Sequence, residues 1–409
     1  MGEIVMMNRR EALGRLTLGW AMAAGGPGLS LFSARTRAAE NARPVLVVAF
    51  LRGGMDGLMA IAPHDDAGYV RARGDFGPES VLALDDRFGL HPALAPLLPL
   101  WQARELSIVH GVGLVEATRS HFDAQGRMEA GGSSAWTGGS GWLNRALAPM
   151  EAPSAFRRAA IGSSVPAILA GPRPVLATSD LRGLGAHAPS SWADGARMNA
   201  LYERSSPGRI EELGREGLGA AEEIRRALGA TRSSRRRRGG RPRAGVGGAL
   251  SQVAELVGSD VGLELAYVEM GGWDTHAGQR PRFERLAGEL ATALSRFWSE
   301  LGAARKRVCL VTLTEFGRTV RPNGSGGTDH GRASCSFVLG GGGGGRGAGA
   351  VRGEVGTLDE DALVDGRDLP VTTDFRALVA TLLKDHMGIL DMERVFPQWA
   401  GPSLDLWRG

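Results

Sequence analysis

The segment from Leu263 to Thr314 constrains the fold most, because it reads as a strand, a helix and a second strand in succession. Residues 263–269 form a short apolar run, and residues 307–314 form another that contains Cys309. Between them, residues 282–301 carry apolar side chains at the three- and four-residue spacing of a helix with one buried face. A strand–helix–strand crossover makes the two strands parallel, so this segment predicts an α/β fold.

Two further apolar runs extend this prediction. Residues 44–51 are almost continuously apolar, as in a strand buried on both faces of a parallel sheet, and residues 106–110 are a shorter candidate. Ligands of such sheets bind beyond the carboxyl ends of the strands. Asp56, Asp274 and Glu315 follow three of the predicted strands, with Asp329 and His330 in the next loop. We therefore expect these side chains to converge.

The amino-terminal 39 residues have the pattern of an export signal. Arg9 and Arg10 precede a weakly apolar stretch, and small residues suited to cleavage follow at residues 34–39. Paired arginines before such a stretch indicate a twin-arginine signal peptide at residues 1–39, and a short amino-terminal helix or anchor is the alternative. We expect the export machinery to be a partner and the mature domain, residues 40–409, to be periplasmic or extracellular, without a stable membrane span.

The net charge of +4 does not indicate a nucleic-acid-binding protein, because the basic residues are clustered. Five arginines fall in the leader and seven lie between Arg232 and Arg243. The Arg/Gly-rich segment at about 231–248 has no interleaved aromatic residues and no recognised nucleic-acid motif. It is interpreted as a flexible, solvated loop, and binding to an acidic polymer is the alternative.

Three glycine-containing turns each deliver a carboxylate, and two of them also deliver a histidine. They are residues 53–57 with Asp56, residues 271–276 with Asp274 and His276, and residues 327–331 with Asp329 and His330. Aspartate and histidine are ligands of divalent cations, and glycine lets the backbone approach one point closely. The turns predict a metallohydrolase.

Several motifs occur in the order seen in one family. They are the leader and residues 50–57 (FLRGGMDG), 118–125 (TRSHFDAQ), 271–276 (GGWDTH), 314–319 (TEFGRT) and 327–331 (GTDHG). The chain resembles the domain of unknown function 1501 family, exported bacterial proteins of the alkaline-phosphatase and sulfatase superfamily. The resemblance covers most of residues 44–390.

The resemblance implies a three-layer α/β/α sandwich with a large, mostly parallel sheet that is alkaline-phosphatase-like. It implies one or two divalent metals, with zinc, manganese or calcium as candidates, beside a hydroxyl nucleophile. By resemblance, Asp56 is the carboxylate after the first strand, and the other ligands are Asp274, His276, Asp329 and His330. His121 and His110 occur near the same region in sequence order, where ordinary hydrogen bonds are the simpler expectation.

Three residues are catalytic candidates, each with an alternative role. Ser120 either is the nucleophile at the start of a helix, or caps that helix with Asp123 three residues later. Arg318 either pairs with a tetrahedral anion, or anchors a loop in an ion pair. Glu315 is a ligand or orients Arg318.

These residues predict a metal-dependent hydrolase of phosphate or sulfate esters that acts on an anionic small molecule or polymer. The alternative is a non-catalytic exported binding or assembly protein that retains the fold. Phosphatases of the superfamily have a third histidine near the carboxyl terminus. Here His386, in a predicted helix end, is a poor substitute for it, and this supports the alternative.

Overall fold

The computed structural model describes residues 43–116, 118–132, 139–147, 157–181, 244–341 and 349–407. The predicted signal peptide at residues 1–39 lies outside the described residues, as do residues 231–243 of the Arg/Gly-rich segment. Residues 244–248 lead into helix α11 (Gly245–Gly258).

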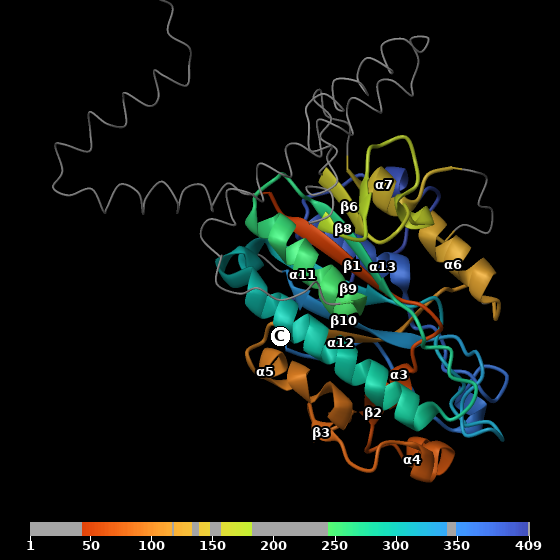
Figure 1. Cartoon of the computed structure of the whole chain (residues 1–409). Coiled ribbons are helices and arrows are strands. Elements are labelled where there is room, and N and C mark those ends of the chain that lie inside the picture. Colours follow the sequence, from red (N-terminus) through yellow and green to blue (C-terminus); the bar gives the residue numbers. More distant parts are fainter. Residues whose placement is uncertain are drawn as a thin grey trace, which may run out of the picture. The chain divides into compact units, whose positions relative to one another are not determined.

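A nine-stranded mixed sheet forms the centre of the described chain (Figure 1). Its order is β11-β5-β10-β9-β1-β8-β6-β7, with β12 pairing with β5. The strands are β1 (Val45–Leu51), β5 (Leu106–Gly113), β6 (Arg158–Ile161), β7 (Leu176–Thr178), β8 (Leu265–Met270), β9 (Val308–Leu313), β10 (Ser334–Gly340), β11 (Val351–Arg352) and β12 (Thr373–Asp374). A second, three-stranded sheet pairs β2 (Ile61–Pro63), β4 (Phe88–Leu90) and β3 (Leu82–Ala83) in that order.

The predicted crossover is present, and β1 lies between its two strands. Strand β1 pairs in parallel with both β8 and β9, and helix α12 (Gln279–Leu301) connects these two. Strand β10 is antiparallel to β9 and to β5, which makes the sheet mixed. The predicted α/β class is confirmed, and the carboxyl ends of β1, β8, β9 and β5 lie at one edge of the sheet.

Alternate side chains of β1 enter two separate cores, one on each face of the sheet. Val45, Val47 and Ala49 pack in the core that contains residues of α11 and α12. Leu46 and Val48 pack in the core that contains residues of α6 (His121–Ala130), α7 (Trp142–Ala146) and α13 (Phe375–Asp385). Helices therefore cover both faces of the sheet (Figure 1). Burying each large apolar side chain between them and the sheet contributes about 1.5–3 kcal/mol to stability.

The remaining helices are short. They are α3 (Gly57–Ala60), α4 (Ala67–Arg73), α5 (Leu98–Gln102) and α14 (Met392–Val395). Cys309 and Cys335 are buried, free thiols. Within the described ranges, no helix combines the length and the apolar character that crossing a membrane requires.

The turns after β1 and β8 pack tightly against each other. Gly53 has φ +117°, and a Cβ atom added there would lie 2.4 Å from the Asp274 amide nitrogen. Only glycine tolerates both this backbone conformation and this contact. The glycine therefore lets the two turns approach and fixes the position of Asp274.

Candidate metal centre

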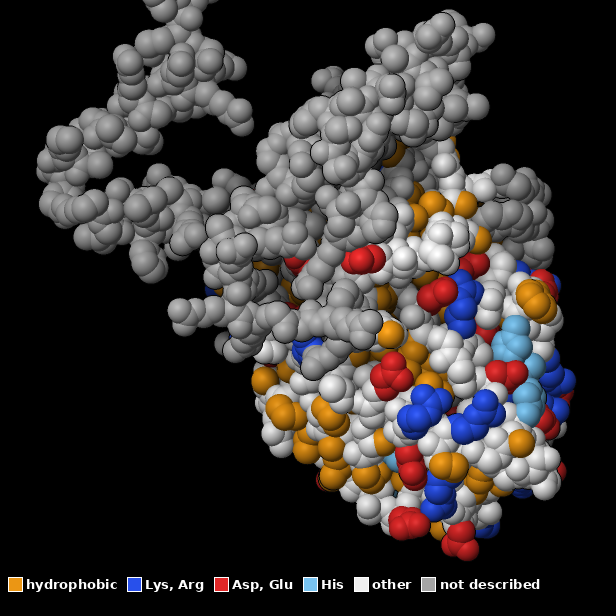
Figure 2. Space-filling view, in the orientation of Figure 1, with side chains coloured by type: hydrophobic (Ala, Val, Ile, Leu, Met, Phe, Trp, Pro, Cys, Tyr) orange, Lys and Arg blue, Asp and Glu red, His pale blue; other side chains and the backbone are white. Residues whose placement is uncertain are grey.

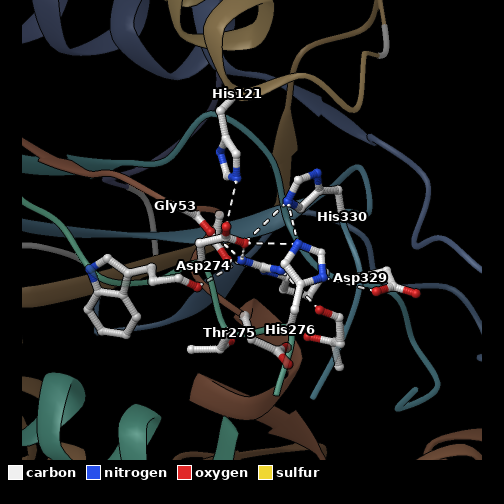
Figure 3. Close-up of polar contacts among 12 residues, drawn as sticks. Gly53, His121, Asp274, Thr275, His276, Asp329 and His330 are labelled. Atoms are coloured by element: carbon white, nitrogen blue, oxygen red, sulfur yellow. Dashed lines mark hydrogen bonds and ion pairs between the residues drawn. The ribbon is translucent and has the colours of Figure 1, made fainter. Parts of the chain in front are cut away.

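At the carboxyl edge of the sheet, ligand atoms of Asp274, His121 and His330 lie within 4.8 Å of one another, and the ring of His276 lies beside Asp274 and His330 (Figure 3). Asp274 and His276 follow β8, His121 begins α6 after β5, and His330 lies between β9 and β10. Asp274 Oδ1 lies 3.1 Å from His276 Nε2 and 3.2 Å from His330 Nε2, and its Oδ2 lies 3.5 Å from His121 Nε2. The two nitrogens His276 Nε2 and His330 Nε2 are 2.9 Å apart.

Hydrogen bonds at the opposite side of each imidazole set the tautomer of its neutral form. Each Nδ1 atom faces an oxygen that accepts: His121 faces Glu315 Oε1 at 2.8 Å, His276 faces Asp329 Oδ1 at 3.0 Å, and His330 faces the Arg119 carbonyl at 2.7 Å. Carboxylate and carbonyl oxygens do not donate, so in the neutral rings Nδ1 carries the hydrogen. All three Nε2 lone pairs are then directed toward Asp274. Metal-binding histidines are held by the same kind of outer hydrogen bond.

The arrangement leaves the inner nitrogens without a proton between them. His121 Nε2 is buried and has no hydrogen-bond partner among the described residues. Burial lowers the pKa of His330, and the Arg119 carbonyl and the Asp274 carboxylate beside the ring oppose the shift. Neutral imidazoles that present lone pairs to each other at 2.9 Å repel, and a cation between them removes the repulsion.

The spacing of the donor atoms fits a metal ion. Bonds of about 2.0–2.2 Å in a tetrahedral site place neighbouring donors about 3.3–3.6 Å apart. The observed separations of Asp274 from the three imidazoles are 3.1–3.5 Å. The ligand atoms of Asp274, His121 and His330 are therefore close enough to share one ion, and His276 Nε2 lies 2.9 Å from His330 Nε2 beside them.

The site is open to solvent on the side of Asp274 and His276. Their side chains are 45% and 43% exposed, whereas those of His121 and His330 are 23% and 18% exposed. In Figure 2, histidine side chains reach the surface beside acidic and basic side chains. A small ligand in solution therefore has access to these donors.

Arg318 is buried and joins the three turns around the site. It donates to Asp274 Oδ1 at 2.6 Å and to main-chain carbonyls in each turn: Gly53 (2.5 Å), Gly54 (2.8 Å), Trp273 (2.9 Å) and Thr328 (3.0 Å). These oxygens occupy the guanidinium, so the geometry supports the loop-anchoring role. To bind an anion, Arg318 has to release some of them.

The charge of Asp274 is set mainly by burial and by Arg318. Burial alone raises the pKa of this carboxyl, but the hydrogen bond and charge of Arg318, helped by His330 and His276, lower it to about 2. Asp274 is consequently a carboxylate at neutral pH, and its second oxygen, 3.5 Å from His121 Nε2, remains available to coordinate a cation.

Glu315 supports His121 rather than Arg318. Its side chain is fully buried, and Oε1 accepts hydrogen bonds of 2.8 Å from the Gly53 amide, from His121 Nδ1 and from Gln125 Nε2. Glu315 thus fixes the ring of His121 and ties it to the turn after β1.

Asp56 lies in a separate buried network. Arg73 donates to both of its oxygens at 2.7 and 3.1 Å, Gln279 Nε2 donates at 2.6 Å, and the Met59 amide donates at 3.0 Å as Asp56 caps α3. Burial raises the pKa of Asp56, and Arg73 outweighs this and lowers it. These bonds occupy the carboxylate, and the structure does not gather it with Asp274.

The other two predicted residues lie at the margin of the donor set. Asp329 lies beside His276, on the side of the ring away from Asp274 (Figure 3), where its Oδ1 accepts from His276 and, at 3.1 Å, from Asn323. Ser120 is exposed and is the N-cap of α6, with Oγ 3.5 Å from the Asp123 amide. It stands between Arg119 and His121, so its position is consistent with both predicted roles.

His121 belongs to the donor set, although the sequence predicts only ordinary hydrogen bonds for it. Its signal was its position, directly after Ser120 and at the start of the helix that follows β5. Parallel strands place their carboxyl ends together. Because His121 and Asp274 each follow such a strand, their positions predict that they lie at the same edge of the sheet.

Comparison with known proteins identifies one protein family whose model matches this chain. The model of the family described as "Protein of unknown function (DUF1501)" matches residues 110–398, a span that contains all four converging side chains. A search among curated proteins gives no match. The match covers more than half of the sequence, and the chain therefore belongs to the DUF1501 family.

Proposed function

We propose that this protein is an exported, metal-dependent hydrolase of phosphate or sulfate esters. The observation that carries the proposal is the convergence of three imidazole nitrogens on the Asp274 carboxylate, each ring held by an acceptor at its far side. The proposed ligands are His121, Asp274, His276 and His330. Asp329 and Glu315 hold two of the rings from outside.

The donor set favours zinc, with manganese as the next candidate. Imidazole nitrogen suits zinc, whereas calcium takes six to eight oxygen ligands. When bound, such a cation polarises a phosphoryl or sulfuryl oxygen and lowers the pKa of a coordinated hydroxyl.

The protein's own groups would then orient the ester. Helix α6 begins at His121, and its amino-terminal amides favour an anionic group there. Ser120 Oγ, at that same end, is the proposed nucleophile, and its exposure leaves it accessible to a substrate. The helices on both faces of the sheet and the site at the strand ends support the alkaline-phosphatase-like assignment, which is part of the proposal.

Elemental analysis of protein purified without chelator tests the metal site. We expect about one equivalent of zinc or manganese in the wild type, loss of that metal in His276→Gln, and retention in the matched control His64→Gln. The metal-loaded protein is then screened with 4-nitrophenyl phosphate and 4-nitrophenyl sulfate. Wild-type protein without stoichiometric metal contradicts the proposal.

One observation favours a second candidate, a non-catalytic exported binding or assembly protein. Four protein donors close a tetrahedral site, as in structural zinc centres, and Arg318 is occupied by main-chain oxygens. This candidate predicts stoichiometric metal without turnover of either ester. Metal content together with the screen therefore separates the two functions.

A further inference from the structure

A buried glutamine joins the three glycine-containing turns. Gln279 is the first residue of α12, and its side chain is fully buried. Its Oε1 atom accepts hydrogen bonds from the hydroxyls of Thr275 at 2.8 Å and Thr328 at 2.6 Å, and its Nε2 atom donates to Asp56 Oδ2 at 2.6 Å. One carboxamide therefore contacts a residue of each turn.

The partners of Gln279 determine which way its carboxamide faces. Asp56 is a carboxylate at neutral pH, because Arg73 lowers its pKa, and a carboxylate only accepts hydrogen bonds. The amide nitrogen of Gln279 therefore faces Asp56, and its oxygen faces the two threonines. Thr275 and Thr328 are buried as well. The carboxamide and its partners form a satisfied polar network, and such networks hold the parts of a core rigidly.

Both threonines are close in the chain to histidines of the donor set. Thr275 immediately precedes His276 (Figure 3), and Thr328 lies two residues before His330. The Thr328 amide also donates to the Thr275 carbonyl at 3.2 Å, so main chain and side chains both connect the two turns. The position of His276 Nε2, 2.9 Å from His330 Nε2, therefore depends on how the two threonines meet at Gln279.

Arg318 connects the same two turns in a different way. It donates to the Asp274 carboxylate and to the main-chain oxygens of Trp273 and Thr328. Arg318 thus holds the aspartate of the donor set, whereas Gln279 holds the side chains that neighbour the two histidines.

We propose that Gln279 is a positioning residue of the metal centre, which sets the spacing of the His276 and His330 nitrogens through Thr275 and Thr328. The inference rests on the proposed function for the metal, and it assigns part of the geometry of the donor set to a buried amide that acts through other residues. Without this amide the two turns lose their common acceptor, and the two imidazoles no longer meet one ion together.

Competition with a chromogenic chelator, which measures the zinc affinity of folded variants, tests this assignment. Gln279→Met removes the carboxamide from an unbranched side chain, and we expect about tenfold weaker binding, the low end of the roughly 10–100-fold effect of an outer partner. Thr328→Val removes one hydroxyl and should cause a smaller loss, whereas Thr328→Ser keeps the hydroxyl and should bind zinc like the wild type. Combining Thr328→Val with Gln279→Met should cause no further loss, because both changes break the same contact.

Asn144→Leu is the matched control, because it also removes a fully buried amide. Asn144 lies in α7, and its amide exchanges hydrogen bonds with the main chain of Leu169 and Arg173, which belong to none of the three turns. This change should lower stability but leave zinc affinity and the absorption spectrum of bound cobalt unchanged. Gln279→Met should alter the cobalt spectrum, which reports the arrangement of the ligands rather than the stability of the fold.

Crystal structures of the chelated proteins separate this proposal from the proposed function. Wild-type protein that binds no zinc contradicts the proposed function, and the distance between His276 Nε2 and His330 Nε2 in the wild type and in Gln279→Met then decides the positioning role. A wider separation in the variant supports it. An unchanged separation overturns it, as does wild-type zinc affinity in folded Gln279→Met. Thr328→Val against Thr328→Ser provides the same comparisons if Gln279→Met does not fold.

Discussion

Two turns with the same Gly-Gly-x-Asp sequence follow neighbouring parallel strands and have opposite environments. Gly53 to Asp56 follow β1, and Gly271 to Asp274 follow β8. The Asp56 side chain is 2% exposed and is paired with Arg73, whereas that of Asp274 is 45% exposed and faces three imidazoles. The strand end determines where each carboxylate lies. The side chains that contact it from other parts of the chain determine its role.

The partners of the two carboxylates explain this difference. Arg73 and Gln279 come from α4 and the start of α12, and they enclose Asp56 completely. Asp274 has one oxygen held by Arg318 and the other directed toward His121. One carboxylate is therefore a structural element, and the other has free donor capacity. Changing each aspartate to asparagine tests this contrast.

Asp56→Asn is expected to cause the largest loss of stability, about 3–5 kcal/mol. The change leaves Arg73, whose side chain is fully buried, without its counter-charge. Denaturant unfolding followed by circular dichroism measures the loss. Asp274→Asn is the matched control and should cost about 1 kcal/mol, because the amide oxygen still accepts from Arg318. Equal losses of stability in the two variants would show that Asp56 and Asp274 do not differ in their structural role.

The two variants should rank in the opposite order for zinc affinity, with the larger loss in Asp274→Asn. Asp274→Asn is expected to weaken zinc binding more than 100-fold, because loss of a direct ligand exceeds the roughly 10–100-fold effect of an outer partner. Asp56→Asn should bind zinc normally once folded. Competition with a chromogenic chelator measures both affinities. Normal zinc binding by Asp274→Asn would exclude this carboxylate from the donor set.

Acid should lower the free energy of unfolding because His110 is buried in its neutral form. Burial, with a smaller effect of Arg87, lowers the pKa of His110 to about 4, against the bond to the Ile61 carbonyl and the charge of Asp56. The unfolded chain binds the extra proton near pH 6.5, so stability is fully present above that pH and falls as the pH approaches 4.

The expected loss from His110 between pH 7 and pH 5 is about 2 kcal/mol. Unfolding of the wild type and of His110→Gln at both pH values measures it. The glutamine can donate to the Ile61 carbonyl and accept from the Gly111 amide, as the neutral ring does at 3.2 and 3.1 Å, but it does not titrate. An identical pH dependence in both proteins would show that His110 does not contribute.

Asp329→Ala tests whether the third glycine turn supplies a supporting group. Asp329 holds His276 from outside, and loss of such a partner weakens metal binding about 10–100-fold. Its half-exposed position predicts little change in stability. Chelator competition compares Asp329→Ala with Asp359→Ala, which removes a half-exposed aspartate paired with Arg71. An affinity loss as large as that of Asp274→Asn would instead make Asp329 a direct ligand.

The sequence predicted the helices and strands that follow from periodicity and strand direction. It did not predict side-chain contacts between residues far apart in the chain. The apolar spacing of residues 282–301 and the flanking runs correctly predicted the crossover of β8, α12 and β9. Antiparallel β10 was not foreseen, because its apolar side chains give no direction. The burial of Asp56 depends on Arg73, and the orientation of His121 depends on Glu315, 194 residues away. No local pattern encodes either pairing.

Ser120→Ala should change stability least and tests whether this residue does more than cap α6. The Oγ atom lies 3.5 Å from the Asp123 amide, a long contact, so the loss should be at the low end for an N-cap, about 0.5 kcal/mol. If Ser120 is the nucleophile, ester turnover falls to the level of the metal-free protein while zinc binding persists. Retained turnover in a folded, zinc-loaded variant would leave Ser120 as a cap only.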